Sequence, residues 1–186
     1  GMEYALKYQQ YLKGLIVSNM MASAPEYGRY ADEVLAKQMK PKILAEIREM
    51  EANKDFDNPK YMELLVPNYY EEHICRLEEW PDGLNRAFKH VNGDIYTLVQ
   101  GPSEFGIGGR LTHWDIKDRL KEITKPTLMI GGKYDTMDPE AMEEQSNMVQ
   151  NGHFLLCPNG SHLSMWDDQQ IYMTGVVDFI KNVDRD

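Results

Sequence analysis

The sequence has little of three things that would point to particular classes of protein: cysteine, positive charge and long apolar runs. Two cysteines, Cys75 and Cys157, are too few for a disulfide framework, so we expect two reduced thiols and a cytoplasmic protein. A formal net charge of −10 argues against binding to nucleic acid or to an anionic membrane surface. No apolar run approaches the ~18 residues that a membrane span requires, and no charged-then-apolar leader is evident.

Motifs for bound metals and cofactors are lacking as well. The histidines His73, His90, His113 and His153 show no paired spacing and no nearby carboxylate cluster of the kind that holds zinc or iron. The glycine-rich string at 106–109 lacks the lysine and the preceding strand of a phosphate-binding loop, so we interpret it as a turn. We therefore expect no metal and no cofactor, and we place these four histidines at the surface or behind the functional site.

What the sequence does contain is an alternation of strand and helix signals near both of its ends. Apolar strand-like runs at 127–130 and 154–157 alternate with helical periodicity over 139–149 and 172–183. Near the start, 12–19 is apolar on both faces, which is typical of a strand in a parallel sheet. The predicted fold class is therefore α/β, with about three parallel strands, flanking helices and right-handed crossovers.

Between residues 24 and 118 the pattern is helical and has few strand-like runs. We expect helices over 41–53, from 59 to an interruption at Pro67 with a second run through Ile74, over 82–90 and over 92–100. The chain accordingly divides into a first core segment at 2–23, a helical cap at 24–118 and a second core segment at 119–186.

Two residues of catalytic type follow the last two predicted strands. Asp135 ends the string Gly-Gly-Lys-Tyr-Asp, and His162 ends the string Asn-Gly-Ser-His. Reactive groups of open α/β sheets lie on loops at the carboxyl ends of the strands. A carboxylate on one imidazole nitrogen fixes the tautomer, and the other nitrogen then takes a proton from a nucleophile. The alternatives are a turn or cap role for Asp135 and a solvated loop position for His162.

The nucleophile that such a pair would activate is not evident. In α/β-hydrolases it lies in a G-x-S-x-G string between a strand and a helix, and no such string occurs in the 186 residues. Ser161 and Ser164 are poor substitutes because neither lies at a strand-to-helix turn that would face His162.

Several strings distributed along the chain are specific enough to indicate a family. They are Gly-Pro-Ser-Glu-Phe (101–105), Trp-Asp-Ile-Lys-Asp-Arg-Leu (114–120), Gly-Lys-Tyr-Asp (132–135), Gly-Ser-His-Leu (160–163), His-Ile-Cys-Arg (73–76) and Trp-Pro (80–81). Together they resemble the proline iminopeptidases, and among these the tricorn-interacting aminopeptidase type, within the α/β-hydrolase superfamily.

The resemblance implies a serine aminopeptidase that removes an N-terminal residue, often proline, from short peptides through an acyl-enzyme. It matches Asp135 and His162 to the acid and base of the catalytic triad. It also matches Glu104 to a carboxylate of the cap that binds the α-ammonium of the substrate by a charge-assisted hydrogen bond. Thr136 stands where the family often has a second glutamate, a departure that bears on strict aminopeptidase specificity.

The segment at 2–6 resembles the helix that follows the nucleophile turn in this family. The resemblance therefore covers a C-terminal portion only, with the serine and the oxyanion-hole segment expected upstream of residue 1. We expect this chain alone to be inactive, and we expect the strand at 12–19 to pair with a second copy or with an N-terminal fragment. The alternatives are a non-catalytic binding or vestigial module, or another α/β-hydrolase such as an esterase or epoxide hydrolase.

Overall fold

The computed structural model describes residues 1–185, and its strands form one parallel sheet of three strands in the order β1-β2-β3. Leu15 lies opposite Thr127, and Thr127 lies opposite Gly152, so the three strands begin level with one another. The predicted α/β class with three parallel strands is confirmed. The strands are β1 (Leu15–Ser18), β2 (Thr127–Gly132) and β3 (Gly152–Cys157).

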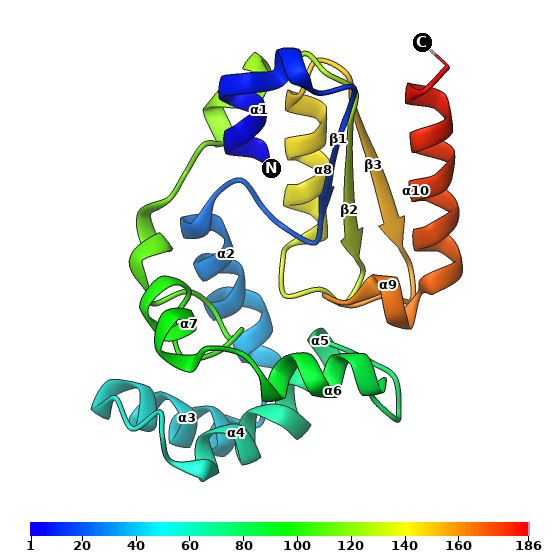
Figure 1. Ribbon diagram of the computed structural model, residues 1–186. Coiled ribbons are helices and arrows are strands. Elements are labelled where there is room, and N and C mark those ends of the chain that lie inside the picture. Colours follow the sequence, from blue (N-terminus) through cyan, green and yellow to red (C-terminus); the bar gives the residue numbers. More distant parts are fainter. Residues whose placement is uncertain (186) are drawn as a thin grey trace.

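The central strand β2 is buried along its whole length because helices cover both faces of the sheet (Figure 1). Met129 packs with Met2 and Ala5 of the first helix on one face. Leu128 and Ile130 point to the other face, where the last helix covers them. Burial on both faces explains the continuous apolar run of β2. The covering helices are α1 (Met2–Tyr8) and α8 (Pro139–Met148) on one face and α10 (Gln169–Val183) on the other.

The helices between β1 and β2 form a layer beyond the carboxyl ends of the strands (Figure 1). This layer has its own apolar core, which includes Ile47, Tyr61, Leu65 and Tyr69. Its α-helices are α2 (Ala24–Tyr30), α3 (Pro41–Asn53), α4 (Pro59–Leu65), α5 (Glu71–His73), α6 (Asp82–Lys89) and α7 (Gly93–Val99).

The remaining helical segments are short. α9 (Ser164–Asp167) lies between β3 and α10. The others are the π-helical turns η2 (Ala31–Leu35) and η4 (Val66–Tyr70) and the 3₁₀ turns η1 (Gln9–Tyr11), η3 (Ala36–Gln38), η5 (Arg110–His113) and η6 (Lys117–Glu122).

Two details of the sequence prediction are wrong. Pro67 does not interrupt the helix: the backbone widens into the π-helical turn η4, which accommodates a residue without an N–H, and continues into α5. β1 is shorter than 12–19 and alternates between buried and half-buried residues, because it pairs only with β2 among residues 1–185.

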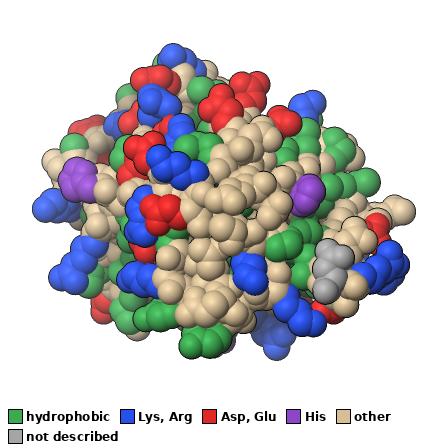
Figure 2. Space-filling model, turned by 90° about the horizontal axis from the view of Figure 1, so that it is seen from above, with side chains coloured by type: hydrophobic (Ala, Val, Ile, Leu, Met, Phe, Trp, Pro, Cys, Tyr) green, Lys and Arg blue, Asp and Glu red, His purple; other side chains and the backbone are tan. Residues whose placement is uncertain are grey.

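The surface mixes charges of both signs. Figure 2 views the end of the molecule opposite the cap, where acidic and basic side chains are interspersed. Cys75 and Cys157 are both free and buried. Burial raises the pKa of the Cys157 thiol to about 11, so it is protonated at neutral pH. No helix among residues 1–185 is long and apolar enough to cross a membrane.

Candidate active site

The structure brings the two predicted catalytic residues into direct contact. Asp135 follows β2 and His162 follows β3, and Nδ1 of the imidazole lies 2.8 Å from Oδ1 of the carboxylate. The Asp135 side chain is completely buried, whereas 22% of the His162 side chain is exposed. The backbone N–H of Met137 donates a second hydrogen bond to Oδ1, at 3.0 Å. The carboxylate is thus fixed by the loop that carries it.

The two loops meet because Gly132 lets their backbones approach closely. A Cβ atom at this position would lie 2.4 Å from the carbonyl oxygen of Ser161 and 2.6 Å from that of Gly160. The backbone N–H of Tyr134 donates to the same Gly160 oxygen at 3.0 Å. Glycine is therefore required here for space between the loops.

The charge of the pair follows from its surroundings. Burial lowers the pKa of His162, but the charge of Asp135 and the hydrogen bond to it outweigh burial and raise that pKa to about 9. The charges of Glu104 and Asp167 act in the same direction. Nε2 has no hydrogen-bond partner among residues 1–185. At neutral pH the pair is therefore an imidazolium–carboxylate ion pair with one free N–H.

Two further residues contact this pair. The sequence alone does not place either of them in the site. The hydroxyl of Thr136, known from the sequence only as a departure from the family, lies 3.3 Å from Nδ1 of His162 and 3.4 Å from Oδ1 of Asp135. Asn19, the residue after β1, donates from Nδ2 to Oδ2 of Asp135 at 2.6 Å. A polar residue at the end of a strand was the only signal in the sequence for Asn19.

The cap holds the histidine loop through backbone hydrogen bonds. The N–H groups of His162 and Leu163 donate to the carbonyl oxygens of His73 and Ile74, each at 2.9 Å. The string His-Ile-Cys-Arg, singled out in the sequence, thus lies directly against the loop of the candidate base. The His73 side chain is buried with Nδ1 2.8 Å from the carbonyl oxygen of Tyr134, so it belongs behind the site and not at the surface.

The serines near His162 are engaged elsewhere. The hydroxyl of Ser161 donates to the carbonyl oxygen of Ile74 at 2.7 Å and also bonds to Asp167. The hydroxyl of Ser164 donates to the carbonyl oxygen of Ser161 at 2.6 Å. Both side chains are fully buried, which agrees with the prediction that neither acts as the nucleophile.

Glu104 lies in the cap, on a loop that four tyrosines hold in place. Tyr27 and Tyr69 donate to its carbonyl oxygen, at 2.5 and 3.2 Å, and its N–H donates to the hydroxyl of Tyr70 at 3.0 Å. The hydroxyl of Tyr96, from α7, donates to the carboxylate itself. Burial and the charge of Glu104 raise the pKa of Tyr96, so this hydroxyl stays protonated and remains a donor.

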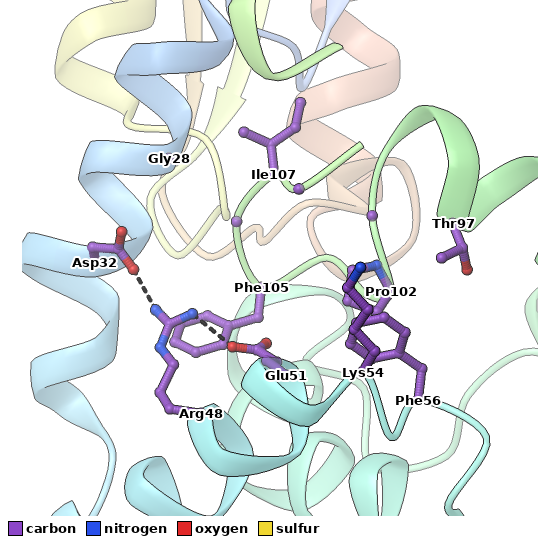
Figure 3. Close-up of a pocket in the computed structure, with 13 residues that line it drawn as sticks. Gly28, Asp32, Arg48, Glu51, Lys54, Phe56, Thr97, Pro102, Phe105 and Ile107 are labelled. Atoms are coloured by element: carbon purple, nitrogen blue, oxygen red, sulfur yellow. Dashed lines mark hydrogen bonds and ion pairs between the residues drawn. The ribbon is translucent and has the colours of Figure 1, made fainter. Parts of the chain in front are cut away.

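Glu104 is one of the residues that line a cleft of about 780 Å³ in the cap. Its apolar lining comes from Phe56, Met62, Tyr70, Phe88, Val91, Tyr96, Leu98 and Pro102. A neighbouring cavity of about 360 Å³ shares part of this lining, and Figure 3 shows Arg48 there, between Asp32 and Glu51 and beside the Phe105 ring. Arg48 is already paired with the carboxylates of Asp32 and Glu51, so none of these three charges is free to bind a ligand in this cavity.

Comparison with known proteins agrees with the fold. No protein-family model matches the sequence. The proline iminopeptidase of Flavobacterium johnsoniae is 76% identical over 183 residues, which are 98% of this chain and 62% of that protein. The proline iminopeptidase of Elizabethkingia meningoseptica is 70% identical over 99% of this chain and 62% of its own length.

Among solved structures, the proline iminopeptidase of Mycobacterium smegmatis superposes with a TM-score of 0.84 at 24% identity, over 99% of this chain and 62% of that one. That likeness shows the fold. The chain spans about 62% of the length of the curated relatives it matches. Sequence identity and fold together place it in the proline iminopeptidase family of α/β-hydrolases, as a C-terminal portion of that fold.

Proposed function

We propose that this chain supplies the acid and the base of a serine aminopeptidase that removes an N-terminal residue, often proline, from short peptides. The observation that carries the proposal is the 2.8 Å contact between Asp135 and His162 at the ends of adjacent parallel strands. In this role Nε2 of His162 takes the proton of a serine hydroxyl and returns it to the leaving amine. Asp135 holds the tautomer and stabilises the imidazolium.

Glu104 gives the proposed reaction its preference for a free N-terminus. Glu104 is half-buried and lines the cleft, where its carboxylate would bind an ammonium group by a charge-assisted hydrogen bond. A blocked N-terminus lacks the positive charge that this bond requires. The apolar lining of the cleft suits a prolyl or other apolar side chain. Tyr96 already donates to this carboxylate, which leaves its other oxygen for the substrate.

The chain alone is proposed to be inactive. It contains no G-x-S-x-G string, so His162 has no evident serine nucleophile to activate. Purified chain is expected to show no hydrolysis of a fluorogenic prolyl amide. Turnover that a serine-directed inhibitor abolishes would overturn this part of the proposal.

A chimera tests the catalytic roles directly. The matching 62% of the Flavobacterium johnsoniae protein is replaced by this chain, which is 76% identical to it. The chimera should hydrolyse prolyl amide, and His162→Ala should reduce kcat by at least about a thousandfold. A fully active His162→Ala chimera would refute the assignment of the base.

The division into core segments 2–23 and 119–186 and a cap at 24–118 is part of the proposal, supported by the separate apolar core of the cap.

Pairing of the β1 edge with a second copy or with an N-terminal fragment is also part of the proposal. That pairing is supported by the single neighbour of β1 in the described chain and by exposed apolar residues of α10 such as Met173, Val177 and Ile180. Light scattering on purified chain would show a dimer; a stable monomer would exclude the second copy.

A cytoplasmic location is proposed on the basis of the two free, buried thiols of Cys75 and Cys157. Fractionation of cells that express the tagged protein from its own promoter tests the location. Recovery in an extracellular fraction would contradict it.

A further inference from the structure

Asn19 joins β1 to both catalytic loops through a single amide group. Its Nδ2 donates to Oδ2 of Asp135 at 2.6 Å and lies 3.2 Å from the carbonyl oxygen of Ser161 and 3.3 Å from the hydroxyl of Ser164. The side chain is buried, with 4% of its surface exposed. Among residues 1–185, this amide is the one hydrogen-bond donor to Oδ2, whereas the partners of Oδ1 are His162, Met137 and Thr136.

The amide is oriented with its NH₂ group toward the carboxylate. The hydroxyl of Ser18 donates to Oδ1 of Asn19 at 2.7 Å, and the hydroxyl of Tyr172 donates in turn to Ser18 at 2.9 Å. A flipped amide would place two oxygens against each other at 2.6 Å and lose the bond from Ser18. The orientation therefore follows from the neighbours on both sides.

The backbone at this position also suits asparagine. Asn19 has a φ of 51°, in the left-handed region, which asparagine, aspartate and glycine adopt more readily than other residues. Its N–H continues the ladder to β2, donating to the carbonyl oxygen of Ile130 at 2.8 Å. The turn at the end of β1 thus directs the side chain toward the loop after β2.

We propose that Asn19 is a positioning residue: its amide holds the carboxylate of Asp135 in the orientation in which Oδ1 faces Nδ1 of His162. The hydrogen bond also gives a partner to an oxygen of a carboxylate that has no access to water. The meaning of this role for catalysis rests on the proposed function. The contact itself is tested in the chain without any turnover.

The first test compares two substitutions that fit the same backbone. Asn19→Gly removes the amide, and Asn19→Asp keeps its shape but replaces the donor by a carboxylate facing Asp135. We expect Asn19→Asp to lower the folding equilibrium constant at pH 7 at least tenfold more than Asn19→Gly does, because two carboxylates would share the site. The gap should shrink at acid pH, where the added carboxyl binds a proton. If the aspartate variant is the milder of the two throughout, the amide only fills space and the proposal is wrong.

The second test observes the hydrogen bond of the imidazole by NMR. In the unsubstituted chain, the Nδ1 proton of His162 should give a low-field resonance that exchanges slowly with water. Asn19→Gly should abolish or broaden it, whereas Asn151→Gly, which removes another amide bonded at 2.7 Å to the carbonyl oxygen of Thr124, should leave it unchanged. A resonance that survives Asn19→Gly intact would overturn the proposal.

Ser18→Ala covers the case in which the Asn19 variants do not fold. It removes the hydroxyl that fixes the amide orientation and leaves the contacts of Asp135 in place. Exchange of the Nδ1 proton should become at least severalfold faster. An unchanged exchange rate would contradict the orienting role of the hydrogen-bonded side chains that lead from Tyr172 through Ser18 and Asn19 to Asp135.

Discussion

The two carboxylates of the candidate site are held in very different ways. Asp135 is completely buried at the end of the central strand and accepts hydrogen bonds from a backbone N–H, an asparagine and the imidazole. Glu104 is half-buried on a cap loop and depends on tyrosine hydroxyls from α2, η4 and α7. The sheet therefore fixes the Asp135–His162 pair, whereas side-chain contacts of the cap fix the proposed amine-binding group.

The helix that reaches Glu104 is itself loosely attached. α7 has no buried residue, and Ile95 and Leu98 are 59% and 49% exposed. Few buried apolar contacts mean a low cost of local opening. The comparison predicts that changes near Asp135 affect the stability of the whole chain, while changes near Glu104 stay local.

The largest effect should come from Asp135→Ala. It leaves an imidazole without its carboxylate and unsatisfied donors in a buried site, so we expect the free energy of unfolding at pH 7 to fall by about 3 kcal/mol. Urea denaturation measures this. A loss below about 1 kcal/mol would show that the pair is not a structural element of the sheet, and the comparison would fail.

Gly132→Ala should rank second. The added methyl group would lie 2.4 Å from a backbone oxygen of the histidine loop, and backbone cannot move aside as a flexible side chain can. We expect a loss of about 2 kcal/mol, in the range of overpacked cores. Gly93→Ala, at a position with nothing within 4 Å, is the matched control and should have little effect.

Tyr96→Phe should have a smaller and local effect. It removes one hydrogen bond to Glu104, which we expect to lower the free energy of local opening of α7 by about 1 kcal/mol, as measured by amide hydrogen exchange. The pKa of His162 should change by no more than a few tenths. In the chimera the KM for prolyl amide should rise severalfold while kcat changes little. An equal fall in kcat would instead connect the cap carboxylate to the Asp135–His162 pair.

The smallest effect should come from Lys13→Ala, at the far end of the sheet. Its ion pair with Asp184 measures 2.8 Å, but the two side chains are 75% and 56% exposed. Exposed pairs contribute from about 0 to 1 kcal/mol, and salt screens them. A loss above 1 kcal/mol that persists in high salt would show that burial of charge does not explain the difference between Asp135 and Glu104.

Sequence reasoning locates the parts of the site that follow from local rules. Strand periodicity and the position of loops at strand ends are enough to bring Asp135 and His162 to one edge, and Pro41 with helical periodicity gives α3 its observed bounds. Asn19 and Thr136 could not be assigned, because a single polar residue beside a strand has no motif and its partners are distant in sequence. The effect of Pro67 depended on a π-helical turn that periodicity does not reveal.

The most direct test of the account is the pKa of His162, measured by NMR titration of the imidazole in the purified chain. Contact with Asp135 predicts a value of about 9, against about 6.5 for an unpaired histidine. Because the folded-state pKa is the higher one, the stabilisation is fully present below pH 6.5 and is lost as the pH rises through 9. A His162 pKa near 6.5 and a stability that does not decline between pH 6.5 and 9 would contradict the buried Asp135–His162 ion pair.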